Sequence, residues 1–188
     1  MQIIETPLKD CWLIKNSLFH DERGYFLESF NHQKFSTATG WQGHFVQDNQ
    51  SASTYGVVRG LHFQRGEYAQ AKLVRVVHGR VLDVAVDLRP DSPSFGQSYC
   101  VELSDNNEYQ LFVPRGFAHG FSVLSDKAVF FYKCDNYYNK PSEGGIHPFD
   151  TELAIDWQVP LSDAILSAKD VGAGSWADFV AGLQMPST

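Results

Sequence analysis

Short runs of β-branched and aromatic residues, separated by turn signals, extend along most of this chain. The clearest pair, residues 72–77 and 80–88, flanks His78-Gly79, and a two-residue connection that contains glycine predicts a β-hairpin. Aromatic residues make up 14% of the chain, which also favours β-structure. Many short strands with little helix predict an all-β sandwich or barrel. The double-sheet jelly roll is the architecture that we expect, with a pocket between its two sheets.

Further extended segments follow the same pattern. They are predicted at 12–18, 25–30, 45–50, 99–103, 109–113, 122–124 and 129–134. Helix is expected in two places: a short turn that Asn31 caps and that ends near Gly40, and a C-terminal helix around 176–183. Residues 114–121, which contain His119, are predicted to form a tight connection between strands.

The length of 188 residues favours one domain, 1–188, with a substantial core. Hydrophobic residues make up 43% of the chain and charged residues 20%, and no apolar run approaches the roughly 20 residues of a membrane span. The three cysteines are scattered, so neither a disulfide framework nor a zinc site is indicated. The N-terminus lacks a signal-peptide pattern. We therefore expect a cytoplasmic protein with no membrane partner.

The net charge of −7 limits the possible partners. Proteins that bind nucleic acid present a basic face, so this composition argues against a nucleic-acid partner. A small phosphorylated ligand is compatible with the charge, because its site needs only a few local cations.

Residues 57–64 carry an unusual set of side chains. Arg59 and His62 stand among apolar residues and Gly60, and Lys72 follows eight residues after the stretch. In an unbroken strand Arg59 and His62 would point to opposite faces, but a bulge at Gly60 would bring both to one side. The alternative interpretation is a structural strand with a partly buried histidine and two solvated cations.

Two histidines in separate segments, His62 and His119, could suggest a metal-binding cupin. That class of site asks for a His-x-His pair and a downstream Glu, whereas Phe63 and Gln64 follow His62. A first-row metal held by histidine normally needs three protein ligands. We therefore expect no metal, and a metal-dependent oxygenase is disfavoured.

A site without a metal must use its side chains directly. His62 is the natural general base, because imidazole titrates near neutral pH. A carboxylate that holds its far nitrogen would help, and three aspartates are open candidates: Asp83, Asp87 and Asp170. Strand alternation places Tyr132 on the opposite face from Phe131, where it could serve the pocket or the core.

Five segments, taken in order, resemble the dTDP-4-dehydrorhamnose 3,5-epimerase family: 58–64, 72–76, 79–89, 114–121 and 166–170. The resemblance runs from about Met1 to Asp170 in unbroken order. It implies a cupin that needs neither metal nor cofactor, forms a homodimer and acts on a dTDP-sugar in nucleotide-sugar biosynthesis.

The resemblance also implies roles for individual residues. His62 resembles the proton acceptor, Asp170 the carboxylate that orients it, and Tyr132 the proton donor, while Lys72 matches the cation near the sugar's C4 oxygen. Substrate-contacting positions correspond to Arg23, Glu28, Gln47, Asp48, Asn49, Arg59, Lys72, His119, Tyr138, Glu143 and Lys169. Tyr138 matches the aromatic that stacks on thymine, with the neighbouring Tyr137 as the alternative. The N-terminal contacts are expected to serve the partner subunit's pocket.

Other functions remain open on the same scaffold. A single-position epimerase or a 3,4-ketoisomerase of dTDP-sugars would share the fold and the histidine, although retention of both His62 and Tyr132 favours double epimerisation. A non-catalytic sugar-binding cupin would be expected to lack this acid-base pair.

Overall fold

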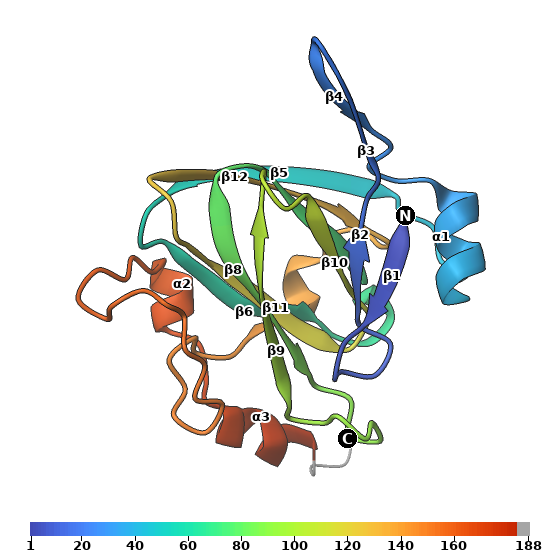
Figure 1. Cartoon of the computed structure of the whole chain (residues 1–188). Helices are drawn as coiled ribbons and strands as arrows, with labels where there is room; N and C mark the ends of the chain where they lie inside the picture. The colour runs from blue at the N-terminus through green and yellow to red at the C-terminus, as the bar shows by residue number, and fades with distance from the viewer. Residues whose placement is uncertain (184–188) are drawn as a thin grey trace.

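The computed structural model describes residues 1–183, which form two facing sheets and a projecting hairpin (Figure 1). The six-stranded sheet has the order β1 (Gln2–Glu5), β2 (Trp12–Lys15), β10 (Tyr109–Val113), β7 (Lys72–His78), β12 (Lys127–Cys134) and β5 (Gln47–Thr54). The five-stranded sheet has the order β13 (Glu143–Gly145), β6 (Val58–Gln64), β11 (Phe117–Val123), β8 (Arg80–Asp87) and β9 (Ser98–Ser104). The hairpin consists of β3 (Leu18–Asp21) and β4 (Gly24–Leu27).

The helices are short and lie at the margins of the sheets. They are α1 (His32–Thr39), α2 (Ala168–Val171) and α3 (Trp176–Leu183), with 3-10 turns at Gly66–Tyr68 and Lys140–Ser142. Asn31 caps α1 and Gly40 ends it in the left-handed conformation, as predicted. The all-β jelly roll with short C-terminal helices is confirmed. The prediction of a single domain over 1–188 includes residues 184–188, which lie outside the described part of the chain.

The predicted hairpin at His78-Gly79 is wrong. β7 pairs with β10 and β12, whereas β8 pairs with β11 and β9, so the two strands lie in different sheets. Val74 and Val81 meet in the core between the sheets. Gly79, with a φ of 80°, turns the chain from one sheet to the other, and its backbone is bonded to Asp105. A glycine link between two β-branched runs therefore marks a corner of the sandwich here.

The segment predicted as a tight connection also differs from the structure. Residues from Phe117 onward belong to β11, in the middle of the five-stranded sheet, and His119 is opposite His62 of β6. Every residue of β11 is buried, because the core lies on one face and the C-terminal third of the chain covers the other. His119 therefore lies on a rigid strand rather than in a loop.

Of the two arrangements considered for residues 57–64, an unbroken strand or a bulge at Gly60, the structure has the bulge. The register of β6 against β11 shifts between the pairs His119–His62 and Phe121–Arg59. Gly60 has a φ of 117°, and a Cβ atom there would lie 2.7 Å from the Cα of Gly120. Both Arg59 and His62 consequently border the same cavity between the sheets.

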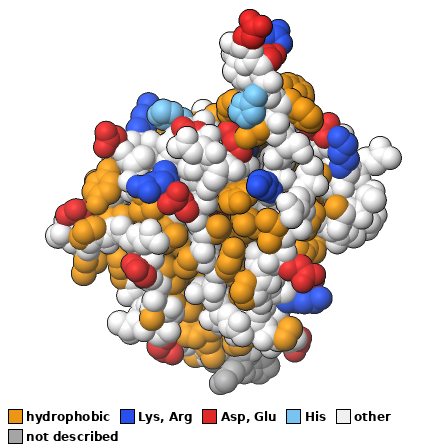
Figure 2. Space-filling view, viewed as in Figure 1, with side chains coloured by type: hydrophobic (Ala, Val, Ile, Leu, Met, Phe, Trp, Pro, Cys, Tyr) orange, Lys and Arg blue, Asp and Glu red, His pale blue; other side chains and the backbone are white. Residues whose placement is uncertain are grey.

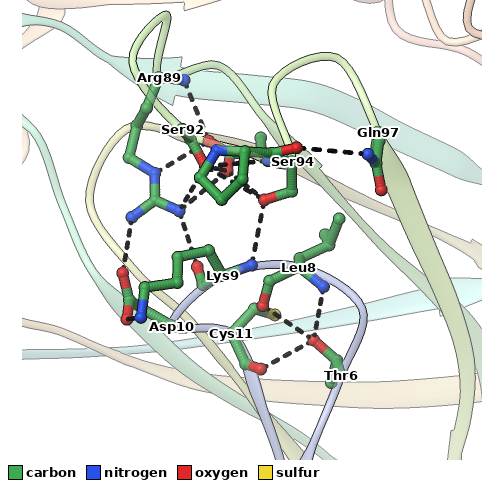
Figure 3. Close-up of polar contacts among 11 residues, drawn as sticks. Thr6, Leu8, Lys9, Asp10, Cys11, Arg89, Ser92, Ser94 and Gln97 are labelled. Carbon is green, nitrogen blue, oxygen red and sulfur yellow. Dashed lines mark hydrogen bonds and ion pairs between the residues drawn. The ribbon is translucent and has the colours of Figure 1, made fainter.

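The N-terminal segment is fastened to the loop that follows β8. Arg89 donates hydrogen bonds to the backbone carbonyl of Lys9 at 2.7 Å and to Asp10 at 3.0 Å, and Ser94 accepts one from Lys9 N at 3.0 Å (Figure 3). Arg89 also binds Asp87, a candidate partner for His62 that is fully buried in this network instead. A hollow of about 700 Å³ lies beside these contacts. Its polar groups largely bind one another, so we assign this region to structure.

The β3–β4 hairpin projects away from the two sheets (Figure 1). Phe19 and Phe26 on it are 62% and 68% exposed, which is unusual for phenylalanine in a folded chain. Charged side chains occupy its tip (Figure 2), where Arg23 pairs with Asp21. Within residues 1–183, no helix has the length and apolar character needed to cross a membrane.

Candidate active site

Three neighbouring cavities, of about 310, 350 and 140 Å³, have His62 in their walls. Lys72 and Tyr132 line two of them, and Asp170 lines the third. His62 comes from the five-stranded sheet, whereas Lys72 and Tyr132 come from the six-stranded sheet. The fold thus places a histidine across the cavity from a lysine and a tyrosine.

His62 is held by a carboxylate from far along the chain. Its Nε2 lies 2.5 Å from Oδ1 of Asp170. Asp170 is only 2% exposed and belongs to α2, a helix of a single turn. Burial alone would raise the pKa of Asp170, but hydrogen bonds from His62 and Ser167 outweigh it and the pKa lies below its usual range. With Nε2 donating to an ionised Asp170, Nδ1 is the ring nitrogen that can accept a proton.

Tyr132 lies on the inner face of the six-stranded sheet. Phe130, Tyr132 and Cys134 share this face, while Phe131 points the other way, as the alternation predicted. Burial raises the pKa of the Tyr132 phenol, so the group keeps its proton at neutral pH. A phenol that stays protonated is suited to donating a proton rather than accepting one.

Lys72 lies beside Tyr132, with its ammonium 5.9 Å from the centre of the ring. Removal from bulk water lowers the pKa of this ammonium, and negative neighbours only partly offset the effect. A cation in a desolvated wall interacts strongly with a negative charge that develops nearby.

We expect Lys72 to lose its proton below pH 10.5, the ordinary lysine value. Desolvation disfavours the charged form, so the amine becomes neutral at a lower pH than a lysine in water. NMR of ¹⁵N-lysine-labelled protein, with the signal assigned by its loss in Lys72→Met, would give the titration midpoint. A midpoint at or above 10.5 would contradict the burial argument.

A second histidine–carboxylate pair lies beside the cavity of about 140 Å³, which His119 lines. His119 Nε2 is 2.9 and 3.1 Å from the two oxygens of Asp83, and both side chains are buried. Asp83 therefore pairs with His119 and Asp87 with Arg89, which leaves Asp170 as the partner of His62 among the three aspartates considered. Within residues 1–183, no group of three or more His, Cys, Asp or Glu side chains is arranged to hold a metal ion. The absence of a metal remains a prediction.

The chain matches the family model of dTDP-4-dehydrorhamnose 3,5-epimerase over residues 5–178. This chain belongs to the dTDP-4-dehydrorhamnose 3,5-epimerase family. The family member of Escherichia coli K12 is 54% identical over 170 residues, covering 90% of this chain and 91% of that protein. The member from Elizabethkingia anophelis NUHP1 has a crystal structure that is 58% identical, with a TM-score of 0.92 over 95% of this chain and 97% of that one.

A third relative was solved with a sugar nucleotide. The dTDP-6-deoxy-D-glucose-3,5-epimerase of Legionella pneumophila Philadelphia 1, in complex with dTDP-4-keto-L-rhamnose, is 46% identical to this chain. Its TM-score is 0.89, and the match covers 95% of this chain and 96% of that one. The fold of this chain is therefore the family fold over nearly its whole length.

Most of the substrate-contacting positions suggested by the family resemblance border the cavities around His62. They are Gln47, Asn49, Arg59, Lys72, His119, Tyr138, Glu143 and Lys169. Glu143 pairs with Lys169 and accepts a hydrogen bond from the Tyr138 hydroxyl at 3.3 Å. Both tyrosines are largely exposed, Tyr138 at 55% and Tyr137 at 64%, but only Tyr138 lines the cavity. This geometry favours Tyr138 over Tyr137 as the stacking residue.

Three of the suggested contacts do not reach these cavities. Asp48 lies on the face of β5 opposite to Gln47 and Asn49, where it pairs with Lys133 at 3.0 Å. Arg23 and Glu28 lie on or next to the projecting hairpin, Glu28 in an ion pair with Lys34. Their contact with substrate remains a prediction, which for Arg23 and Glu28 requires the pocket of another subunit.

Gln64 has a role that sequence reasoning missed. It stands two residues after His62, where a metal-binding cupin would carry its second histidine. From the sequence, Gln64 indicated only that a metal site is disfavoured. In the structure its side-chain amide donates to the carbonyls of Tyr68 at 2.7 Å and Tyr137 at 3.2 Å. Its oxygen accepts a hydrogen bond from Asn139 N at 2.6 Å. Gln64 thereby anchors the segment that carries Tyr138.

Proposed function

We propose that this protein epimerises dTDP-4-dehydro-6-deoxy-D-glucose at C3 and C5 to give dTDP-4-dehydro-L-rhamnose, without a metal or cofactor. The observation that carries the proposal is the placement of His62 and Tyr132 on opposing sheets across one cavity, with Lys72 beside Tyr132. Membership of the epimerase family and the bound sugar nucleotide of the Legionella relative support the same substrate class.

The chemistry follows from the ketone at C4. C3 and C5 are both adjacent to the carbonyl, so their protons are acidified, and removal of either leaves an enolate whose charge collects on the C4 oxygen. His62 takes the proton on Nδ1 while Asp170 stabilises the imidazolium that forms. Lys72 offsets the charge on the oxygen. His62 thus holds the proton, the C4 oxygen of the substrate holds the electron pair, and Lys72 stabilises the resulting negative charge.

Inversion requires the new proton to arrive from the opposite face of the sugar ring. Tyr132 supplies it, because its phenol faces the cavity from the sheet opposite to that of His62. Before the second carbon reacts, His62 releases the abstracted proton to solvent and the Tyr132 phenolate takes one up from solvent. The same base and acid then act at the second carbon after the ring has shifted. A sandwich of two sheets provides such opposed groups directly, which a site on one sheet face could not do.

The nucleotide and the sugar of the substrate have further partners in two of the three cavities. Tyr138 stacks on the thymine. Arg59, which donates a hydrogen bond to Ser53 at 3.1 Å, lines the cavity of about 140 Å³ and supplies a cation for the diphosphate or sugar oxygens. A homodimer would add Arg23 and Glu28, because the projecting hairpin exposes Phe19 and Phe26 for contact with another subunit. We place the protein in the cytoplasm, where its three free cysteines need no partners.

We expect mixed dimers to reveal the role of the hairpin. If Arg23 serves the partner's pocket, an Arg23→Ala subunit paired with a His62→Ala subunit forms one complete pocket, with His62 from one chain and Arg23 from the other. Activity then rises when the two nearly inactive proteins are mixed. Each mixed dimer should approach half of the wild-type activity, because one of its two pockets is complete. If the activity of the mixture stays at the sum of the two separate variants, although their subunits are shown to exchange, Arg23 does not serve the pocket of the partner subunit.

Product analysis tests the function against the two related activities. NMR of the product formed from dTDP-4-keto-6-deoxyglucose should show inversion at both C3 and C5. Inversion at one carbon would identify a single-position epimerase, and a ketone moved to C3 would identify a 3,4-ketoisomerase. Tight binding with no conversion would instead support a non-catalytic sugar-binding cupin.

A further inference from the structure

The carboxylate of Asp170 is held by a helix cap. Ser167 immediately precedes α2, and its hydroxyl accepts a hydrogen bond from Asp170 N at 3.1 Å while donating one to Asp170 Oδ2 at 2.8 Å. The other oxygen, Oδ1, contacts His62. Both oxygens of the buried carboxylate therefore have a fixed partner, one of them the histidine and the other a serine three residues earlier.

The same sequence pattern begins α3, eight residues later. Ser175 accepts a hydrogen bond from Asp178 N at 3.1 Å and donates to Asp178 Oδ2 at 2.7 Å. There the carboxylate also returns to the helix start, since Asp178 Oδ2 accepts from Ser175 N at 2.9 Å. This is a complete capping box, with serine and acid satisfying each other's backbone groups.

The two caps differ in what the acid does. Asp178 is exposed and serves its own helix, whereas Asp170 is buried and turns Oδ1 to Nε2 of His62. We propose that Ser167 is a positioning residue for the proton transfer, acting through Asp170 to hold His62 with Nδ1 towards the cavity. This inference rests on the function proposed above.

Three physical effects support a role for the Ser167 hydroxyl. α2 has only four residues, and a helix of one turn cannot by itself hold a side chain in place. The terminal torsion of an aspartate is broad, so a second fixed oxygen is needed to set the plane of the carboxylate. Hydrogen bonds to the ionised form also stabilise it, and Ser167 is one of the groups that lower the pKa of Asp170.

The charged groups around the pair stay the same when Ser167 is changed. Lys169 follows on α2, Glu143 faces His62 from β13, and Lys72 lies across the cavity on β7. A change in the pH dependence on removal of the hydroxyl therefore reports the hydroxyl itself. Without this donor the pKa of the Asp170 carboxyl rises, so the pair loses its ionised carboxylate at a higher pH and the acidic limb of kcat/KM should move upward.

The test compares three variants. Ser167→Ala removes the hydroxyl, Ser167→Thr keeps one, and Ser175→Ala removes the matched cap of α3, whose serine lines none of the three cavities. We expect Ser167→Ala to lower kcat about tenfold with KM little changed, since a hydrogen bond to a charged group is lost. Ser167→Thr should restore most of kcat, and Ser175→Ala should leave kcat and the pH profile unchanged.

An NMR titration of the Asp170 carboxyl without substrate gives a readout that does not depend on activity, because the Ser167 hydrogen bond is one of the causes that lower its pKa. In Ser167→Ala the midpoint should lie above the wild-type value, and in Ser167→Thr it should return. A Ser167→Ala protein with wild-type kcat and a wild-type midpoint would overturn the inference. A lower kcat with an unchanged midpoint and an unchanged acidic limb would also overturn it, because Ser167 would then have a structural role only. If wild-type protein fails to convert the dTDP-sugar, the proposed function fails, while the titration still decides the positioning role.

Discussion

His62→Ala should lower turnover by about 10²–10⁴-fold, the usual contribution of a general base, with substrate binding largely kept. His62 is the side chain that borders all three cavities, and it is paired with the buried Asp170. The nucleotide contacts proposed for Tyr138 and Arg59 do not depend on the imidazole. Steady-state kinetics with dTDP-4-keto-6-deoxyglucose, and calorimetric binding of the unreactive dTDP, would separate the two effects.

A second histidine provides the matched control. His78 is exposed at the end of β7 and lies 3.4 Å from Asp105, away from the cavity. His78→Ala should retain wild-type kcat. Near wild-type turnover in His62→Ala would remove the base from the account and leave the paired histidine His119 as the candidate to examine.

Tyr132→Phe should separate proton removal from inversion. The variant keeps the ring beside Lys72 but lacks the phenolic proton, so His62 can still form the enolate and return a proton from its own side. In D₂O we expect deuterium to enter the recovered substrate while product formation falls by about 10²-fold or more, the contribution of a general acid. Mass spectrometry of substrate and product, sampled over time, would measure both.

Two outcomes would count against this assignment. Product formation at the wild-type rate would mean that another group donates the proton. Loss of exchange to the level of His62→Ala would mean that Tyr132 is needed to form the enolate rather than to quench it. Tyr55→Phe, at an exposed tyrosine outside the cavity, controls for the loss of a hydroxyl as such.

Local patterns predicted the parts of the fold that depend on neighbouring residues. The alternation along β12 separates Tyr132 from Phe131, and the glycine at position 60 raised a bulge as one of two possible arrangements, because both effects arise within a few residues. The pairing of β7 with β8 failed for a different reason. A short link with glycine allows either a hairpin or a corner, and the choice depends on distant strands, β10 and β12 on one side and β11 and β9 on the other.

Local sequence patterns could not identify the carboxylate that pairs with His62. The two residues are 108 positions apart, and three aspartates were equally acceptable from their types alone. The family resemblance singled out Asp170, and the geometry agrees with it. Nothing in the sequence indicated the positioning roles of Ser167 and Gln64, because each acts through the backbone or side chain of another residue. Arg23 and Glu28 depend on a second chain, which the fold of one chain does not contain.

The location of deuterium after complete turnover in D₂O tests the central claim most directly, that one base and one acid on opposing sheets invert two carbons. Wild-type protein incubated with dTDP-4-keto-6-deoxyglucose should give product that carries solvent deuterium at both C3 and C5, with both centres inverted. Product inverted without deuterium at these carbons, or labelled and inverted at only one of them, would contradict the account.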